Sequence, residues 1–319
     1  MSEIDPHEAL IIARQRRLEG GEPAHRDRDL QRIRRGYYRP RASPLTASED
    51  HLLRMHAAAD ARQGTLVFSH TSAAELWGCP MLRTDTQLVH AIQPGKARRT
   101  TAGTQIHRLA VPDEHVVELD NGLLVTSKVW TALQLAALLP LPNALLPLDH
   151  LLGLLNVDPE SDPAAATARA ALLEQLPRGV VGRRRALANL GLADARAGSP
   201  AESLSRGQMV VLGVPRPEIQ VAFPRGDLPG HDVVDFDWPE LQAVGEVDGR
   251  VKLEDETMTR GRTPAEVVWD EKVREDRLRR HRPRVARWGW DIAMSRRRLG
   301  IVLAQAGVVP VAAGARRSA

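Results

Sequence analysis

The sequence reads VVDFDW over residues 233–238 and AVGEVDGRVK over residues 243–252. Both stretches are rich in Val, the first also contains Phe and Trp, and the Pro-Glu step between them fits a turn, so they predict a β-hairpin. Side chains alternate between the two faces of a strand, which brings Asp235 of the first strand close to Glu246 of the second. Like charges so placed repel each other unless a cation or a proton joins them. We therefore expect a divalent metal here, because hard cations bind carboxylate oxygens.

Further acidic side chains are expected around this hairpin. Asp248 shares a face of the second strand with Glu246, and Asp237 shares a face of the first strand with Asp235. A helix is predicted over residues 200–212, because a Ser-Pro step supplies its N-cap and first position, and Glu202 falls in its first turn. From this helix onward the expected order of elements is helix, three strands, helix and strand, that is αβββαβ.

This arrangement resembles the PD-(D/E)XK nuclease core in its very-short-patch-repair (Vsr-like) endonuclease branch. In that branch an acid on one strand and an acid-x-acid-Gly on the next hold the metal, and an upstream helix adds a glutamate. The resemblance covers roughly residues 198–292 and includes the segment EKVRED at residues 271–276. The superfamily's lysine two residues after the second strand acid is absent, because Asp248 stands there, and Lys252 follows four residues later.

The resemblance implies a role for each of these side chains. Mg²⁺ or Mn²⁺ would be bound by Asp235, Glu246 and Asp248, with Glu202 as a further carboxylate. Lys252 would position or deprotonate a water or stabilise the phosphate, and Gln220 would orient the water. Such a site hydrolyses phosphodiester bonds with one or two metal ions, and the sequence leaves that number open. The alternative is that these acids form salt bridges, which we expect for Asp237 and for which Arg250 is available.

A second motif, DLQRIRRGYYRP, spans residues 29–40 and is followed by SHTSAA at residues 69–74. This order resembles the N-terminal region of proteins related to the abortive-infection AbiEi antitoxin, in which a winged-helix wing ends in Arg-Gly-x-Tyr. Such a wing would contact DNA phosphates. The alternative is an arginine-rich hairpin that only closes the fold. The candidate DNA-binding residues are Arg34, Arg35, Tyr37 and Arg39, with Arg183 and Arg184 of a later basic run, for which the alternative is a solvated helix face.

Histidines carry no site in this interpretation. His70 begins a predicted helix, where a cap or a buried hydrogen bond is the expected role. His90, His107 and His115 lack the spacing of metal ligands, so no zinc site is predicted. The single cysteine, Cys79, excludes a disulfide framework.

The predicted fold class is an α+β N-terminal region followed by an α/β nuclease-like domain with the αβββαβ core. We expect a winged-helix-like module over residues 1–64, a mixed α/β region over 65–140, a helical connector over 141–197, the nuclease-like domain over 198–309 and a disordered tail over 310–319. Helices are also expected over residues 5–19 and 46–63, the latter capped by Ser48.

Composition constrains the function only loosely. The 319 residues carry 44 Lys and Arg against 40 Asp and Glu, but an Arg and Ala bias from GC-rich DNA gives the same balance, so charge alone is weak support for nucleic-acid binding. No apolar run reaches the roughly 18 residues of a membrane span. The N-terminus lacks a signal-peptide pattern, so a cytoplasmic protein without membrane partners is expected.

Two hypotheses follow. In the first, the chain is a Mg²⁺-dependent DNA endonuclease, in phage defence or DNA repair, with an N-terminal DNA-binding module. In the second, it is a non-catalytic antitoxin or transcriptional regulator of the AbiEi type that binds DNA and a toxin or other regulatory partner. No phosphate-binding loop or dinucleotide motif is present, so no nucleotide cofactor is expected.

Overall fold

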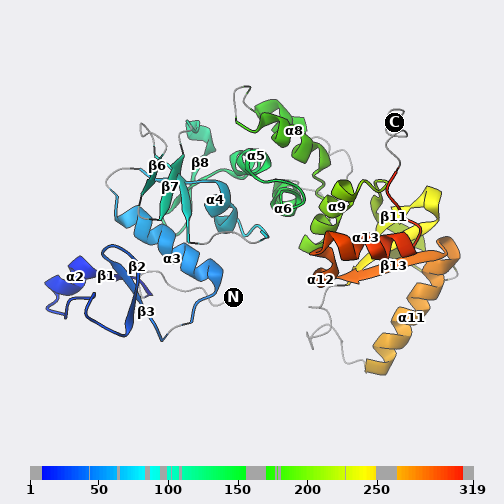
Figure 1. Cartoon of the computed structure of the whole chain (residues 1–319), viewed down its shortest axis with the longest axis horizontal. Helices are drawn as coiled ribbons and strands as arrows, with labels where there is room; N and C mark the ends of the chain where they lie inside the picture. The colour runs from blue at the N-terminus through cyan, green and yellow to red at the C-terminus, as the bar shows by residue number, and fades with distance from the viewer. Residues whose placement is uncertain are drawn as a thin grey trace. The chain divides into compact units, whose positions relative to one another are not determined.

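The computed structural model describes residues 9–42, 44–62, 65–82, 87–93, 99–101, 103–107, 110–155, 170–176, 178, 181–226, 228–248 and 264–311. In these ranges the chain is mixed α+β, with three sheets and helices around them, as the sequence predicted (Figure 1). None of the described helices combines the length and the apolar character that crossing a membrane requires.

The chain divides into two compact units. The first comprises residues 1–138 with 176–186, and the second comprises 139–175 with 187–319. This division differs from the boundary expected near residue 197, because helix α6 (Leu145–Leu155), assigned to a connector, packs against helix α9 (Pro200–Leu212) of the second unit.

A small antiparallel sheet with the order β1-β3-β2 opens the first unit. Strand β1 (Ile11–Ile12) precedes helix α2 (Ala13–Leu18), and strands β2 (Leu30–Arg34) and β3 (Tyr37–Pro40) form a hairpin whose turn contains Gly36 at φ +86°. The helix expected over 5–19 is therefore wrong at Ile11 and Ile12. This β-branched pair favours a strand, and it lies opposite Tyr38 and Tyr37 in β3.

Helix α3 (Ala47–Asp60) follows the hairpin. Its N-cap is Thr46 rather than the expected Ser48: the Thr46 side chain accepts a hydrogen bond from the Glu49 N–H, and the Glu49 carboxylate accepts one from the Thr46 N–H. This reciprocal capping box satisfies two amide groups at once, which a cap at Ser48 would not.

The rest of the first unit is a mixed six-stranded sheet in the order β6-β7-β5-β4-β9-β8. Its strands are β4 (Val67–Phe68), β5 (Val89–Ile92), β6 (Arg99–Thr101), β7 (Thr104–His107), β8 (Val116–Glu118) and β9 (Leu124–Thr126). Helix α4 (His70–Leu76) follows β4, η1 (Asp113–His115) precedes β8, and α5 (Lys128–Leu138) follows β9. The core joins Met55 of α3 and Ala73 of α4 to Phe68, Ile106 and Val125 of the sheet.

The second unit contains α6, α8 (Arg183–Leu192, which begins in the first unit), α9 and a four-stranded sheet in the order β10-β11-β12-β13. The strands are β10 (Glu218–Pro224), β11 (His231–Trp238), β12 (Ala243–Asp248) and β13 (Arg284–Gly289). A 3₁₀ turn, η2 (Pro239–Leu241), joins β11 to β12, and α11 (Pro264–His281) lies between β12 and β13 in sequence. Helices α12 (Trp290–Ala293) and α13 (Arg296–Gln305) end the described chain. The described elements from α9 to β13 follow the order αβββαβ that the sequence predicted, with residues 249–263 lying outside the described ranges.

Helices cover both faces of this sheet (Figure 1). On one face Leu278 of α11 packs against Val234 and Val244. On the other face the Trp288 indole donates to the Ser205 hydroxyl of α9 at 2.9 Å and stacks on Phe236. The first two strand pairs are antiparallel and β12–β13 is parallel, so the sheet is mixed.

Candidate functional site

Two carboxylates of the second unit meet at the side chain of Gln220. Glu202 lies in the first turn of α9, whose N-cap Ser199 accepts the Glu202 N–H at 3.2 Å. The buried Glu202 Oε2 accepts hydrogen bonds from the Gly198 N–H at 2.9 Å and from Gln220 Nε2 at 2.8 Å. Gln220 Nε2 also donates to Asp235 Oδ1 at 3.4 Å. One amide on edge strand β10 therefore lies between acids from α9 and β11.

The backbone is strained at Gln220, the residue that both acids contact. Gln220 has a φ of +54°, in the left-handed region that non-glycine residues rarely adopt. The β10–β11 pairing keeps one register on both sides of it. Yet Val234 contacts α11 and Phe236 contacts Trp288 on the α9 side, whereas a regular strand would place both on one face. Strained residues of this kind persist where the surrounding structure holds them, and they cluster at functional sites.

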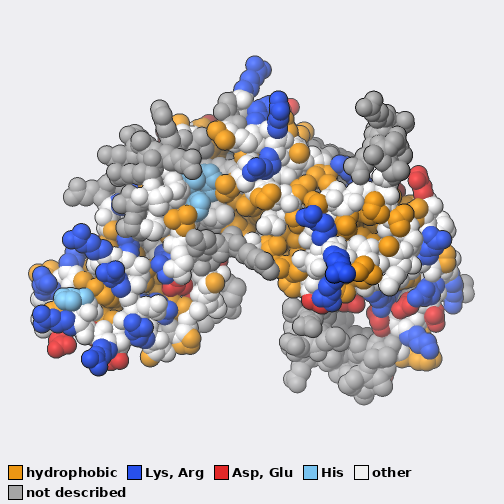
Figure 2. Space-filling model, viewed as in Figure 1, with side chains coloured by type: hydrophobic (Ala, Val, Ile, Leu, Met, Phe, Trp, Pro, Cys, Tyr) orange, Lys and Arg blue, Asp and Glu red, His pale blue; other side chains and the backbone are white. Residues whose placement is uncertain are grey.

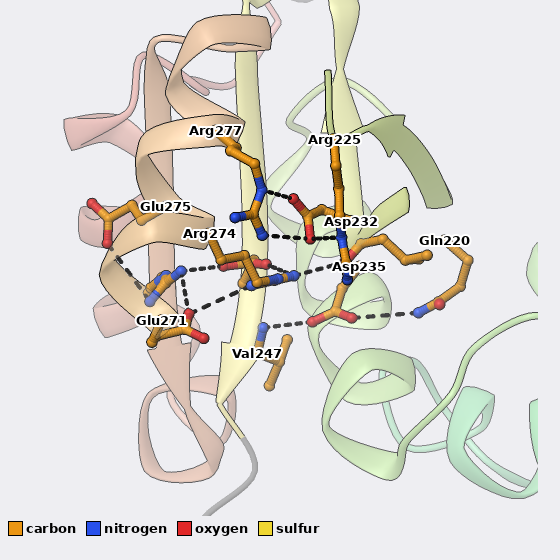
Figure 3. Close-up of polar contacts among 12 residues, drawn as sticks. Gln220, Arg225, Asp232, Asp235, Val247, Glu271, Arg274, Glu275 and Arg277 are labelled. Carbon is orange, nitrogen blue, oxygen red and sulfur yellow. Dashed lines mark hydrogen bonds and ion pairs between the residues drawn. The ribbon is translucent and has the colours of Figure 1, made fainter. Parts of the chain in front are cut away.

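Asp235 is fixed from both sides. Its Oδ2 accepts the Val247 N–H of β12 at 2.7 Å, while Oδ1 faces Gln220, as Figure 3 shows. The β11–β12 register pairs Phe236 with Gly245, so Asp235 and Glu246 are the next residues along their two strands. The backbones of residues 235 and 246 are therefore adjacent, as the sequence predicted.

Glu246 is neutralised by arginines. Its carboxylate is buried, with Oε1 2.5 Å from Arg274 Nη2 and Oε2 2.7 Å from Arg287 Nη2. Glu271 adds a second carboxylate 2.6 Å from Arg287 (Figure 3). Burial opposes the charge of both arginines, but the surrounding carboxylates outweigh it and raise the pKa of Arg274 and Arg287. The charge of Glu246, for which the sequence predicted a metal ion, is balanced by two guanidinium groups instead.

Two other aspartates of β11 hold α11 and the turn after it against the sheet. Asp232 accepts from Arg277 at 2.6 and 3.0 Å and from Arg225 at 2.9 Å, and these hydrogen bonds lower its pKa. Asp237 accepts from Arg282 at 2.7 and 2.9 Å, so it forms the salt bridge expected of it.

The remaining predicted residues of this site are Asp248, Arg250 and Lys252. Asp248 is exposed at the end of β12, opposite Gly289 of β13. Lys252 and Arg250 lie outside the described residues, so the role predicted for Lys252 stays a prediction. Among the described residues, no group of three or more His, Cys, Asp or Glu side chains is arranged to hold a metal ion.

The predicted metal ligands fall into two groups by their contacts in the structure. Glu202 and Asp235 fit a hard cation, because their carboxylate oxygens converge on the same amide. Glu246 does not fit in this arrangement, because each of its oxygens is in ion-pair contact with a guanidinium.

In the first unit the DNA-binding candidates separate into two kinds. Arg34 and Arg35 line a groove beside the β2–β3 hairpin. Tyr37 is buried, and its hydroxyl donates to Asp60 Oδ2 at 2.7 Å. Burial and this hydrogen bond raise the Tyr37 pKa to about 12. Arg39 lies 3.6 Å from Asp50. Tyr37 and Arg39 therefore have structural contacts of the kind the alternative interpretation of the hairpin foresaw.

The two candidate arginines at the start of α8 differ in their exposure. Arg183 is partly buried, and Arg184 is exposed. The next residue, Arg185, donates to the Leu138 carbonyl at 2.7 Å.

Sequence reasoning missed two features. Arg274 and Arg287 were not singled out, although Glu271, Arg274 and Glu275 share a helix face by their spacing. His70, His90 and His107 also gather in the first unit: the His70 and His107 rings stack 3.8 Å apart, and His90 Nδ1 lies 2.9 Å from His107 Nε2. Burial, then the other two imidazoles, lower the pKa of His70. These residues come from α4, β5 and β7, so their spacing in sequence held no signal.

The described fold defines a mixed α+β protein of two units, the second of which carries the acids at Gln220. No family model matches the chain. It is 32% identical over 225 residues to the uncharacterized protein Rv2248 of Mycobacterium tuberculosis (strain ATCC 25618 / H37Rv), and that stretch covers 68% of this chain and 76% of the relative. The uncharacterized protein MT2308 of Mycobacterium tuberculosis (strain CDC 1551 / Oshkosh) matches over the same extent at the same identity. The chain belongs to the family of these proteins.

Proposed function

We propose that the second unit is a divalent-metal-dependent endonuclease domain with a PD-(D/E)XK core that hydrolyses phosphodiester bonds in DNA. The observation that carries the proposal is the convergence of Glu202 and Asp235 on Gln220. Two acids from separate elements share one donor at a strained residue, which is the arrangement of a site rather than of scattered salt bridges. The element order αβββαβ adds support.

Asp235 and Glu202 would hold Mg²⁺ or Mn²⁺, which is sufficient because Mg²⁺ keeps several waters and uses few protein carboxylates. When bound, the cation would lower the pKa of a water and stabilise charge on the phosphodiester. The Val247 N–H holds Asp235 in place, and Gln220 orients both acids. Arg274 and Arg287 pair with Glu246, one residue along β12 from Val247, and so hold this carboxylate beside the proposed site.

Asp235→Asn is expected to abolish cleavage of supercoiled plasmid in Mg²⁺ or Mn²⁺, by at least ~10²-fold, the scale on which enzymes lose rate with one positioned group. The substitution keeps the shape and an acceptor for the Val247 N–H but removes the charge. Asp291→Asn is the matched control, because Asp291 is an exposed aspartate of the same unit. EDTA should abolish cleavage by the wild type as well.

Glu202→Gln provides a second variant should Asp235→Asn fail to fold, and Mn²⁺ binding measured by calorimetry provides a readout without DNA. Weaker Mn²⁺ binding in both variants, with unchanged binding in Asp291→Asn, is expected. Cleavage by Asp235→Asn at the wild-type rate would show that the site is wrongly assigned.

One observation favours a second candidate function, a non-catalytic DNA-binding regulator. Both oxygens of Glu246 are engaged by arginines, so that acid is committed to structure. Plasmid that is shifted on a gel but stays intact in either metal would favour this candidate.

A further inference from the structure

The first unit contains a groove with a volume of about 370 Å³ that is rich in arginine. Its described lining includes Arg32, Arg34 and Arg35 from β2 and the turn after it, Arg54 of α3, and Thr104 of β7. Figure 2 shows several basic side chains on the visible face of the segment that contains α2, β2 and β3, and the sequence of this segment makes all of them arginine. All of these lining residues belong to the first unit.

Only one of the four arginines that line this groove, Arg54, has an ion-pair partner among the described residues. Arg54 pairs with Asp50 at 2.7 Å and donates to the Ile33 carbonyl at 3.3 Å, which fixes the hairpin to α3. In the described part of the chain, Arg32, Arg34 and Arg35 form no ion pair. Arg34 is partly buried, so desolvation lowers its pKa, and its described neighbour is the Tyr37 ring at 6.0 Å. A desolvated guanidinium without a counter-charge is costly unless an anion binds it.

An independent observation comes from Thr104, which lines the same groove. Thr104 is 1% exposed, and its hydroxyl is buried without a hydrogen-bond partner among the described residues. Buried hydroxyls without a partner are rare and need an explanation, such as a bound molecule. An anion with several oxygens would accept from this hydroxyl and from the arginines together.

We propose that this groove binds a phosphate group through Arg34, Arg35 and the Thr104 hydroxyl. Planar guanidinium groups match phosphate oxygens in pairs, and the groove falls within the ~300–1,000 Å³ of small-molecule pockets. The phosphate belongs either to a free ester the size of a nucleotide or to a nucleic-acid backbone. The inference goes beyond the endonuclease proposal, because it concerns the other unit and requires no cleavage.

The test uses the full chain and two substitutions. Arg34→Gln is expected to weaken binding of pyrophosphate, measured by calorimetry at constant ionic strength, by about tenfold or more. Arg17→Gln is the matched control, because Arg17 is an exposed arginine of the same unit and the change in net charge is identical. Thr104→Val should weaken pyrophosphate binding while leaving the melting temperature of the free protein unchanged or higher, because it removes an unsatisfied hydroxyl.

A fluorescent DNA duplex in EDTA identifies the source of the phosphate. Loss of DNA affinity in Arg34→Gln, with the salt slope reduced by about one, supports a backbone phosphate. Loss of pyrophosphate affinity alone supports a free ester. Equal affinities of the wild type, Arg34→Gln and Thr104→Val for both probes would overturn the inference, as would a wild type that binds neither. Because EDTA suppresses cleavage, none of these outcomes depends on the endonuclease proposal.

Discussion

Replacing Asp149 by Ala is expected to lower the free energy of unfolding of the second unit by about 3–5 kcal/mol, the cost of breaking a buried ion pair from one side. Asp149 lies on α6 with its side chain 2% exposed, and its Oδ2 is 2.8 Å from Arg206 Nη1 of α9. Its Oδ1 accepts the Asp194 N–H at 2.8 Å, beyond the end of α8. One carboxylate thus joins three segments of the chain.

The expected loss of stability is large because the substitution leaves a buried arginine without its counter-charge. Arg206 also donates to the Leu192 carbonyl, so it stays buried and loses its counter-charge when Asp149 is removed. Burial is severe here: it raises the Asp149 pKa to about 6, even though Arg206 favours the ionised form. An uncompensated guanidinium in this environment is more costly than the missing hydrogen bond itself.

Asp291→Ala is the matched control for this experiment. Asp291 pairs with Arg298 at 2.9 Å, almost the same distance, but both side chains are 55% exposed. Exposed pairs contribute about 0–1 kcal/mol, because water and salt screen them. Urea unfolding followed by tryptophan fluorescence and by far-ultraviolet circular dichroism measures both variants. A loss of stability in Asp149→Ala no larger than in Asp291→Ala would contradict the role assigned to the pair.

The secondary structure around the site could be predicted because its signals are local. Ser199 and Pro200 mark the start of α9, and alternating apolar residues mark β11 and β12 on either side of a short turn. The neighbouring positions of Asp235 and Glu246 follow from that turn. The stabilising role of Asp149 could not be predicted, because the signals for it are not local. Asp149 lies in a Leu- and Pro-rich stretch that resembles a connector, and its partner Arg206 is distant in sequence.

The partners of the site acids could not be predicted, because they depend on non-local geometry. Arg287 reaches Glu246 through the parallel pairing of β13 with β12, and Arg274 reaches it through the path of α11 along the sheet. Neither relation is encoded in residue spacing. The left-handed backbone at Gln220 is equally invisible in the sequence, since glutamine carries no signal for a positive φ.

Replacing Trp288 by Ala is expected to lower the free energy of unfolding by about 3–5 kcal/mol, the range for truncating a large core aromatic side chain. Trp288 is 2% exposed, and its ring lies nearly parallel to Phe236, with centroids 5.6 Å apart. The strand between them leaves room for it only because residue 245 is glycine: a Cβ there would lie 2.7 Å from the Trp288 ring.

The matched control for this change is Trp269→Ala, because Trp269 of α11 is 64% exposed and loses few contacts. Thermal and urea unfolding of both variants measure the difference. Phe236 and Gly245 are chain neighbours of Asp235 and Glu246, so the cavity left by Trp288 adjoins the strands that carry both acids. Trp288→Ala should therefore also weaken Mn²⁺ binding in the folded protein. A stable Trp288→Ala protein with wild-type Mn²⁺ affinity would show that this aromatic cluster does not support the site.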